Sequence, residues 1–315
     1  FFSEKIMKYA SEYIVPSNIV EQIWTIINDK TNITDLPILE IQTLQEKFRE
    51  YLSCIDAQEK LETTDGMICF KFNPAADISL EGQIILSAAM FHLVNSCLYT
   101  PAPEPKNRLP YTTFKSSAKT PEKLMAAGVK FYTPDEKLSY HNDVFYQDGR
   151  YFIPKYVSLI NLFIGYDAPG NFYYINQRMW HDFEKFFSKG VGQKFKYRPT
   201  PIVYESHIEQ ENAKSPMDNW VDVPVFWKDP SGMKVVFSNG ELRDNESTTV
   251  ISELKKSLLE NDEKLAIPQK TNQIMIFRND IGFHSRDIFK EQKVFEGTTR
   301  LFLRAVSEES ITVPA

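Results

Sequence analysis

The residues with the most informative spacing are His141 and Asp143. They stand at i and i+2, so in an extended segment both side chains point to the same side and can hold one metal ion together. A third ligand from a distant strand would complete a two-histidine, one-carboxylate triad, which leaves coordination positions open and suits non-haem Fe(II) oxygenases. The pair alone is a weak signal, because a hydrogen-bonded loop histidine is the commoner alternative.

A second group of candidates lies near the C-terminal end of the chain. The segment Gln273–Phe277 reads as a buried strand, followed by a turn that carries His284 and then by a strand containing Arg300 and Arg304. The two arginines are an even number of residues apart, so both leave the same face of that strand. There they can bind carboxylates with two parallel hydrogen bonds. The alternative is a pair of arginines on a solvent face.

In this order and spacing, the segments resemble the Fe(II)- and 2-oxoglutarate-dependent oxygenases of the taurine dioxygenase superfamily. The closest resemblance is to the clavaminate synthase-like branch, which includes hydroxylases of free amino acids. Leu138–Phe145 resembles the first metal motif of the branch, His-x-Glu/Asp before an aromatic residue. Asn279–Arg286 together with Gly297–Arg300 resembles its Asn-x-x-x-x-His-Gly-Arg and Asp-Gly-Thr-x-Arg segments. Softer similarity extends from Asp65 to Arg304.

The resemblance implies a role for each candidate residue. His141, Asp143 and His284 would bind Fe(II), Arg300 would bind the distal carboxylate of 2-oxoglutarate, and Arg304 would meet the carboxylate of the substrate. The implied activity is that of a dioxygenase that uses O2 to hydroxylate a free amino acid or a small derivative and decarboxylates 2-oxoglutarate to succinate. Desaturation or cyclisation by the same chemistry, a protein side chain as substrate, and a non-catalytic jelly-roll binding protein stay open as alternatives.

Three features depart from the family pattern. Ser285 replaces the glycine that usually follows the distal histidine, and the connection between His284 and Arg300 is longer than usual. The family often uses a threonine after the first metal strand to help hold 2-oxoglutarate. The corresponding region here is Asn171–Tyr174, which contains no threonine, so we expect another group to replace it.

The elements that must position these residues favour a fold that is mainly β with flanking helices, a double-stranded β-helix (jelly roll). Because His141 and His284 must meet at one metal, we expect a single catalytic domain over 1–315. Its jelly-roll core would span 138–306, with a helix-rich part over 1–137 packed on the barrel and a lid over 206–222. Hydrophobic spacing predicts helices over 17–27, 44–52, 80–98, 178–187 and 247–259. Strands are expected over 67–72, 156–164, 171–175, 202–205, 223–226, 234–237, 273–277 and 298–305. The proline-containing segment 102–120 is expected to be an irregular connection, either a plain surface connection or a loop that lines the mouth of the site.

Composition limits the partners of the chain. Hydrophobic residues make up 42% and charged residues 25% of the 315 residues, so a large core can be buried. The net charge is −6 with no basic stripe, which argues against nucleic acid as a partner. No apolar stretch reaches the ~20 residues of a membrane span. We therefore expect a cytoplasmic protein with a small-molecule substrate and three reduced cysteines, Cys54, Cys69 and Cys97.

The remaining candidates have less specific surroundings. His92 and His181 lie in apolar helical segments and are expected to be core or rim residues, as are Trp180 and Phe183. His207 lies in the expected lid. Acidic side chains in or near that lid are available for a cationic substrate, although a solvated lid face explains them equally well: Glu205, Glu209, Glu211, Asp218 and Asp222.

Overall fold

The computed structural model describes most of the chain. The described residues are 8–104, 108–117, 134, 137–147, 150–198, 220–236, 238, 241–245, 249–293 and 297–314. Among them, no helix is long and apolar enough to cross a membrane. The expected strand over 202–205 and most of the expected lid over 206–222 lie outside the described residues.

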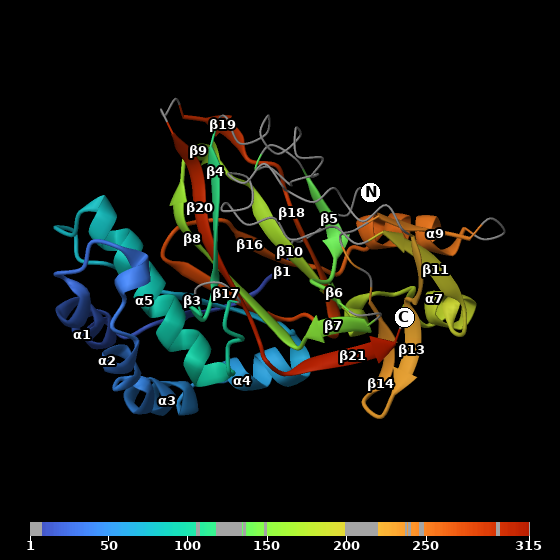
Figure 1. The fold of residues 1–315 in the computed structure, drawn as a ribbon, viewed down its shortest axis with the longest axis horizontal. Coiled ribbons are helices and arrows are strands. Elements are labelled where there is room, and N and C mark those ends of the chain that lie inside the picture. Colours follow the sequence, from blue (N-terminus) through green and yellow to red (C-terminus); the bar gives the residue numbers. More distant parts are fainter. Residues whose placement is uncertain are drawn as a thin grey trace, which may run out of the picture.

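Two large sheets form the centre of the molecule (Figure 1). One has the order β1-β16-β10-β18-β5, and its strands are β1 Lys8–Tyr9, β16 Leu265–Pro268, β10 Asn171–Asn176, β18 Gly282–Arg286 and β5 Leu138–His141. The other has the order β2-β3-β17-β8-β20-β4, and its strands are β2 Ser11–Ile14, β3 Met67–Lys71, β17 Gln273–Arg278, β8 Tyr156–Ile164, β20 Thr298–Val306 and β4 Thr112–Ser117. The N-terminal third therefore supplies strands to both sheets as well as helices.

The inner faces of the two sheets share one hydrophobic cluster. From the five-stranded sheet it takes Phe172 and Ile267, and from the six-stranded sheet Val157, Met275 and Phe277. The alternation along β17 explains this arrangement, because Met275 and Phe277 face the second sheet while the residues between them face the opposite way. The sheets consequently pack face to face, and any polar side chain on an inner face is enclosed between them.

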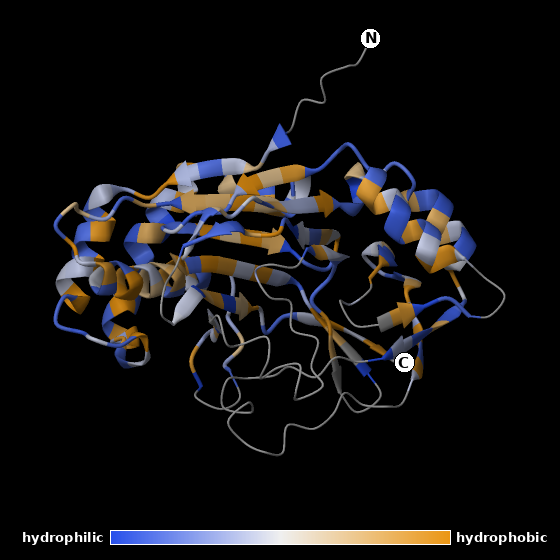
Figure 2. Ribbon diagram, turned by 90° about the horizontal axis from the view of Figure 1, so that it is seen from above, coloured by the Kyte–Doolittle hydropathy of each residue, from blue (hydrophilic) through white to orange (hydrophobic). Residues whose placement is uncertain are grey.

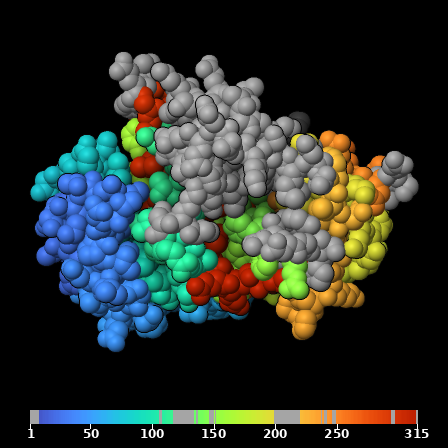
Figure 3. Space-filling view, viewed as in Figure 1, coloured from blue at the N-terminus to red at the C-terminus, as the bar shows by residue number. Residues whose placement is uncertain are grey.

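A layer of helices covers the outer face of the six-stranded sheet, at the blue and cyan end of the molecule in Figures 1 and 3. Its elements are α1 Ser17–Ile27, η1 Ile33–Asp35, α2 Ile38–Gln42, α3 Gln45–Ser53, α4 Ala57–Glu59, η2 Lys60–Thr64 and α5 Leu80–Leu98. Helix α5 lies between β8 on one side and α1, α2 and α3 on the other. This explains why α5 is apolar on most of its faces, as the sequence predicts for a helix packed against a sheet.

A third layer covers the outer face of the five-stranded sheet. It contains η3 Gln177–Met179, α7 Phe183–Gly190 and α9 Val250–Glu260 with a sheet of β11 Lys194–Arg198, β12 Val221–Pro224 and β15 Glu241–Arg243. The remaining strands form small ribbons: β6 Phe145–Gln147, β7 Arg150–Pro154, β9 Tyr166–Ala168, β13 Phe226–Asp229, β14 Gly232–Val235, β19 Lys290–Gln292 and β21 Ser310–Pro314. Trp180 and Phe283 pack together in this layer's core. Hydrophobic residues concentrate on the strands between the layers (Figure 2).

The structure confirms a mainly β fold with flanking helices and corrects several details. The helices over 17–27 and 80–98 and the strand over 156–164 occur as expected. The connection over 102–120 is not irregular throughout, because 112–117 forms β4 and pairs with β20. His284 lies in strand β18 rather than in a turn. The segment 178–187 is α-helical only from Phe183, after the 3-10 turn η3, and 223–226 is divided between β12 and β13.

Candidate metal centre and its arginines

His141, Asp143 and His284 meet as a buried cluster whose ligand atoms all lie within 4.8 Å of one another. His141 ends β5 and pairs in register with His284 of β18, and the chain continues from β5 to Asp143. Asp143 Oδ1 lies 3.7 Å from His141 Nε2 and 3.6 Å from His284 Nε2. Ligands at right angles on one ion lie about 3.0 Å apart when the metal bonds are ~2.1 Å. A small contraction of the cluster therefore fits one ion.

The protonation states of the cluster suit a divalent cation. His141 Nδ1 lies 2.7 Å from the Ser139 carbonyl oxygen, which can only accept, so Nδ1 carries the proton and Nε2 is free to bind metal. Burial and the neighbouring His141 hold the pKa of His284 well below its usual range, so its imidazole is neutral. Burial raises the pKa of Asp143, but Arg304 and the two histidines outweigh it, and the net pKa lies well below its usual value.

A clamp of two buried asparagines fixes the backbone that carries Asp143. Asn279 Oδ1 accepts from the Asp143 amide at 2.8 Å, and Asn279 Nδ2 donates to the Asp143 carbonyl at 2.8 Å and to the Pro154 carbonyl at 3.0 Å. Asn142 Nδ2 donates to the carbonyls of Asn279 and Gly282, each at 2.7 Å. The segment that follows β5 is thereby tied to the turn between β17 and β18, and Asp143 and His284 are held in one frame.

Buried charges hold the same turn from the other side. Arg278 donates to Asp280 at 2.8 and 2.9 Å and to Glu62 at 2.7 Å. Lys234 Nζ lies 3.3 Å from Asp280, and both side chains are about 95% buried. Because a buried charge without a partner is costly, this network fixes the turn that precedes His284.

Arg304 reaches across from the six-stranded sheet to the metal cluster. Its NH1 group donates to Asp143 Oδ2 at 3.1 Å, so it neutralises the carboxylate on the side away from the two histidines. Its guanidinium also lies 5.0 Å from the ring centre of Phe114 and 5.8 Å from that of Phe145. Asp143 is its only salt-bridge partner among the described residues, so donors on this guanidinium are available to a second carboxylate.

Arg300 is buried with little to balance its charge. Its guanidinium lies 4.1 Å from the ring centre of Phe302 and 4.7 Å from that of Phe289, and its Nε donates to Asn161 Oδ1 at 2.9 Å. No carboxylate pairs with it in the described part of the chain. Burial and the nearby Arg286 lower the pKa of Arg300 well below its usual value. An anion bound here would offset both the burial of the positive charge and its repulsion by Arg286, so the surroundings of Arg300 favour a carboxylate ligand.

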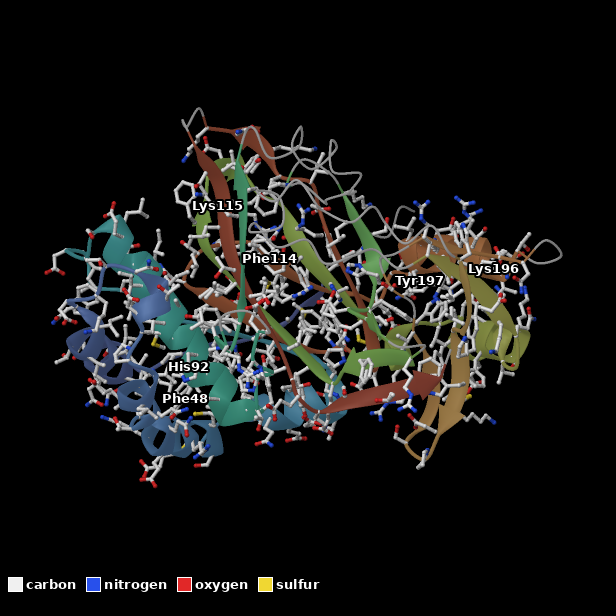
Figure 4. All side chains as sticks on the ribbon, viewed as in Figure 1. Phe48, His92, Phe114, Lys115, Lys196 and Tyr197 are labelled. Carbon is white, nitrogen blue, oxygen red and sulfur yellow. The ribbon has the colours of Figure 1, made fainter. Side chains whose placement is uncertain are left out.

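Stacked aromatic rings connect the two arginines. Phe302 stacks on Phe114 of β4 at 4.8 Å, so Arg300 contacts one ring of the pair and Arg304 contacts the other. Figure 4 shows Phe114 on β4, the strand that lies within the segment expected to be irregular. The even spacing of the arginines therefore places both on one face, as the sequence predicts.

Other candidates lie apart from this cluster. Asp222 is exposed and pairs with Lys196 of β11 at 2.8 Å (Figure 4 labels Lys196). His181 is mostly exposed and hydrogen-bonds Asn261, whereas His92 is buried in α5. Glu205, His207, Glu209, Glu211 and Asp218 lie outside the described residues. Trp180 is buried, Phe183 is partly buried in the same core, and the three cysteines are unpaired.

Sequence reasoning assigned no role to several polar residues around the site. Asn142 and Asn279 position the Asp143 backbone, and Asn161 contacts Arg300. A signal for Asn161 is present, because it is a polar residue among the apolar residues Val157, Leu159 and Phe163 that share its face of β8. The contacts of Phe289 and Phe114 with the arginines depend on tertiary structure and have no local signal.

Comparison with solved structures places this fold among non-haem iron oxygenases. The oxygenase OrfP in complex with Fe and alpha-ketoglutaric acid aligns with a TM-score of 0.62 and 12% identity over 94% of this chain and 93% of that chain. Asparagine oxygenase in complex with Fe(II), 2S,3S-3-hydroxyasparagine and succinate aligns with a TM-score of 0.60 and 14% identity over 94% and 93%. OrfP in complex with Fe and L-Arg gives 0.61 and 10% over 95% and 94%.

These comparisons establish the fold, whereas the chemistry has to be inferred from the residues of the site. No family model matches the chain, and no curated protein matches its sequence. At identities of 10–14%, the comparison shows that this chain and these oxygenases share the arrangement of their helices and strands. Within that architecture, the chain carries a buried His-Asp-His cluster with the donor set of an iron site and two arginines beside it.

Proposed function

We propose that the protein is an Fe(II)- and 2-oxoglutarate-dependent dioxygenase that hydroxylates a free amino acid or a small amino-acid derivative. One observation carries the proposal. The His141, Asp143 and His284 cluster lies on the inner side of one sheet, and Arg304 of the facing sheet reaches it. Arg300 lies on the same strand as Arg304 and has no carboxylate partner among the described residues. Three metal-capable side chains and two arginines are thereby enclosed together between the sheets.

Each residue would have a distinct task. His141 and His284 would bind Fe(II) through Nε2, and Asp143 through its carboxylate, which Arg304 keeps ionised. Arg300 would anchor the distal carboxylate of 2-oxoglutarate. With both cofactors in place, the chemistry supplied is oxidation of a substrate C–H bond by O2, with release of succinate and CO2. The rings of Phe172 and Phe277 pack on His284 and exclude water from that side of the site.

Two observations favour an amino acid as the substrate. Arg304 has donors left after its contact with Asp143, and these can bind an α-carboxylate close to the metal. Structural neighbours were solved with L-Arg and with hydroxyasparagine bound. We further propose that residues 1–315 form one catalytic domain, because the core under the helices includes side chains of β8, β17 and β20. We also propose a cytoplasmic location, in which the unpaired thiols stay reduced.

The test begins with the resting complex. Fe(II) and 2-oxoglutarate are added to the protein without O2, and the visible charge-transfer absorption of the chelate is recorded. We expect a band for the wild type, no band for His284→Ala, and an unchanged band for His181→Ala, the matched control outside the cluster. Free amino acids are then screened for O2-dependent succinate formation. A wild type without a band would overturn the oxygenase assignment and favour the non-catalytic alternative, and a band without stimulation by any amino acid would overturn the substrate class.

A further inference from the structure

Among the described residues, only the oxygen end of the Asn161 side-chain amide makes a hydrogen bond. Asn161 lies in β8, is 1% exposed, and accepts a hydrogen bond from Arg300 Nε through Oδ1 at 2.9 Å. Because Arg300 Nε can only donate, this contact fixes which end of the amide faces the guanidinium. The other end, Asn161 Nδ2, is buried and has no hydrogen-bond partner among the residues that the structure describes. A buried donor in this state is costly, so its position calls for a bound acceptor.

This donor lies beside the Arg300 guanidinium, which has no carboxylate partner in the described part of the chain. The oxygen and nitrogen of an amide are about 2.2 Å apart, so Asn161 Nδ2 is no more than about 5 Å from Arg300 Nε. The rings of Phe289 and Phe302 hold the guanidinium in place. Arg300 and Asn161 thus present neighbouring donors on one inner face, within the span that a single carboxylate can bridge.

The segment Asn171–Tyr174, which lacks the threonine expected from the family pattern, does not supply such a donor. In Asn171–Tyr174, Phe172 has no polar group and stacks on His284. The Tyr173 hydroxyl donates to Asp287 at 2.9 Å, and the Tyr174 hydroxyl donates to the Arg278 carbonyl at 2.8 Å. Asn171 donates to the Tyr173 hydroxyl. These polar groups are already engaged in contacts away from Arg300.

We propose that Asn161 is a second anchor for the distal carboxylate of 2-oxoglutarate, with Oδ1 orienting Arg300 and Nδ2 donating to the carboxylate. The proposal rests on the proposed function and adds to it a residue that determines which oxo acid is accepted. A 2-oxo acid without a distal carboxylate leaves the amide and the guanidinium both unpaired, so the pair selects a dicarboxylic cosubstrate.

The experiment measures binding rather than turnover. Protein loaded with Mn(II) is titrated by calorimetry with 2-oxoglutarate and with 2-oxopentanoate, which carries a methyl group in place of the distal carboxylate. The variants are Asn161→Ala, Asn161→Thr, which restores a donor, and the matched control Asn95→Ala, which removes a buried asparagine of α5. Thermal unfolding of each variant confirms that it is folded.

We expect Asn161→Ala to weaken 2-oxoglutarate binding by roughly ten- to a hundredfold, the usual effect of losing a hydrogen bond to a charged group. Binding of 2-oxopentanoate should change by less than about twofold, Asn161→Thr should recover part of the loss, and Asn95→Ala should change neither affinity. Equal losses for both oxo acids, or no loss, would overturn the proposal. Failure of the wild type to bind either oxo acid would instead count against the proposed function.

A crystal structure of the wild type with Mn(II) and 2-oxoglutarate separates direct contact from orientation of Arg300 alone. It also decides the matter if the variants fail to fold. We expect Asn161 Nδ2 within about 3.2 Å of a distal carboxylate oxygen. If the distal carboxylate contacts Arg300 but not Asn161 Nδ2, Asn161 is only a positioning residue and the second anchor is refuted.

Discussion

Asn279 offers the sharpest test of how the fold positions the metal ligands. Replacing it with alanine removes three hydrogen bonds and leaves the Asp143 amide, the Asp143 carbonyl and the Pro154 carbonyl without their partner. Each unsatisfied buried group costs about 1–3 kcal/mol, so the unfolding free energy should fall by about 3 kcal/mol or more. The Asp143 backbone also loses its tie to the β17–β18 turn, and support of this kind typically contributes 10–100-fold to metal affinity.

The assay pairs Mn(II) affinity, measured by the EPR signal of the free ion, with urea denaturation. Asn261 provides a matched control, because it is equally buried and makes three comparable contacts, with His181, Met179 and Glu263, next to α9. We expect Asn279→Ala and Asn261→Ala to lower stability to a similar extent, and only Asn279→Ala to weaken Mn(II) binding. Wild-type Mn(II) affinity in folded Asn279→Ala would refute the positioning role.

Three further outcomes follow from the contacts described above. Arg304→Ala should raise the KM for the amino acid tenfold or more and change 2-oxoglutarate affinity by less than about twofold; an effect on 2-oxoglutarate alone would reverse the roles of the two arginines. Asp280→Asn should lower the unfolding free energy by about 3 kcal/mol, because two buried cations lose their shared partner, whereas exposed Lys256→Ala should change it by less than ~0.5 kcal/mol in the same urea titration. Burial lowers the pKa of His92 from 6.5 to about 4, so the unfolded chain binds the proton more readily, and the wild type should lose up to about 3 kcal/mol relative to His92→Leu as pH falls from 6.5 to 4. A stability difference that stays constant over that range would contradict the neutral, buried state of His92.

Hydrophobic patterns in the sequence correctly predict the bounds of elements that pack against apolar side chains. Helix α5 and strand β8 have the expected bounds because their hydrophobic runs are long and end at turn-forming residues. The composition of β18 predicts a turn, because Gly282, His284, Ser285 and Arg286 are polar or flexible. His284 belongs to the metal-capable cluster and pairs with His141 of β5, so tertiary contacts decide the conformation there and local preference does not.

Prolines and short segments account for other differences. Pro110 and the prolines before it predict an irregular connection. They all precede β4, however, which forms a strand by pairing with β20. The helix expected from residue 178 begins at Phe183 because the Asn176 side chain accepts from the Arg178 amide and starts a short 3-10 turn instead. Such side-chain contacts with the backbone are not visible in hydrophobic periodicity.

The site itself was predictable where spacing within a strand sets geometry. The His-x-Asp pair and the even spacing of the arginines follow from the alternation of side chains along an extended chain. The contact between Arg304 and Asp143 and the position of Asn161 beside Arg300 do not, since each joins residues of different strands. The strands are brought together by packing between layers, and a single sequence contains no direct record of which residues will face one another.

The departures from the family pattern also have a structural explanation. Ser285 lies next to His284 in β18, so its side chain leaves the opposite face and does not obstruct the proposed metal ligands. The longer connection to Arg300 pairs Lys290–Gln292 with β9 and places Phe289 against the Arg300 guanidinium. Ser285 and the longer connection between His284 and Arg300 therefore change the surroundings of the His141, Asp143 and His284 cluster and leave its three side chains in place. One sheet carries the three proposed metal ligands and the facing sheet carries the two arginines, so the proposed chemistry depends on the packing between the sheets more than on any single motif.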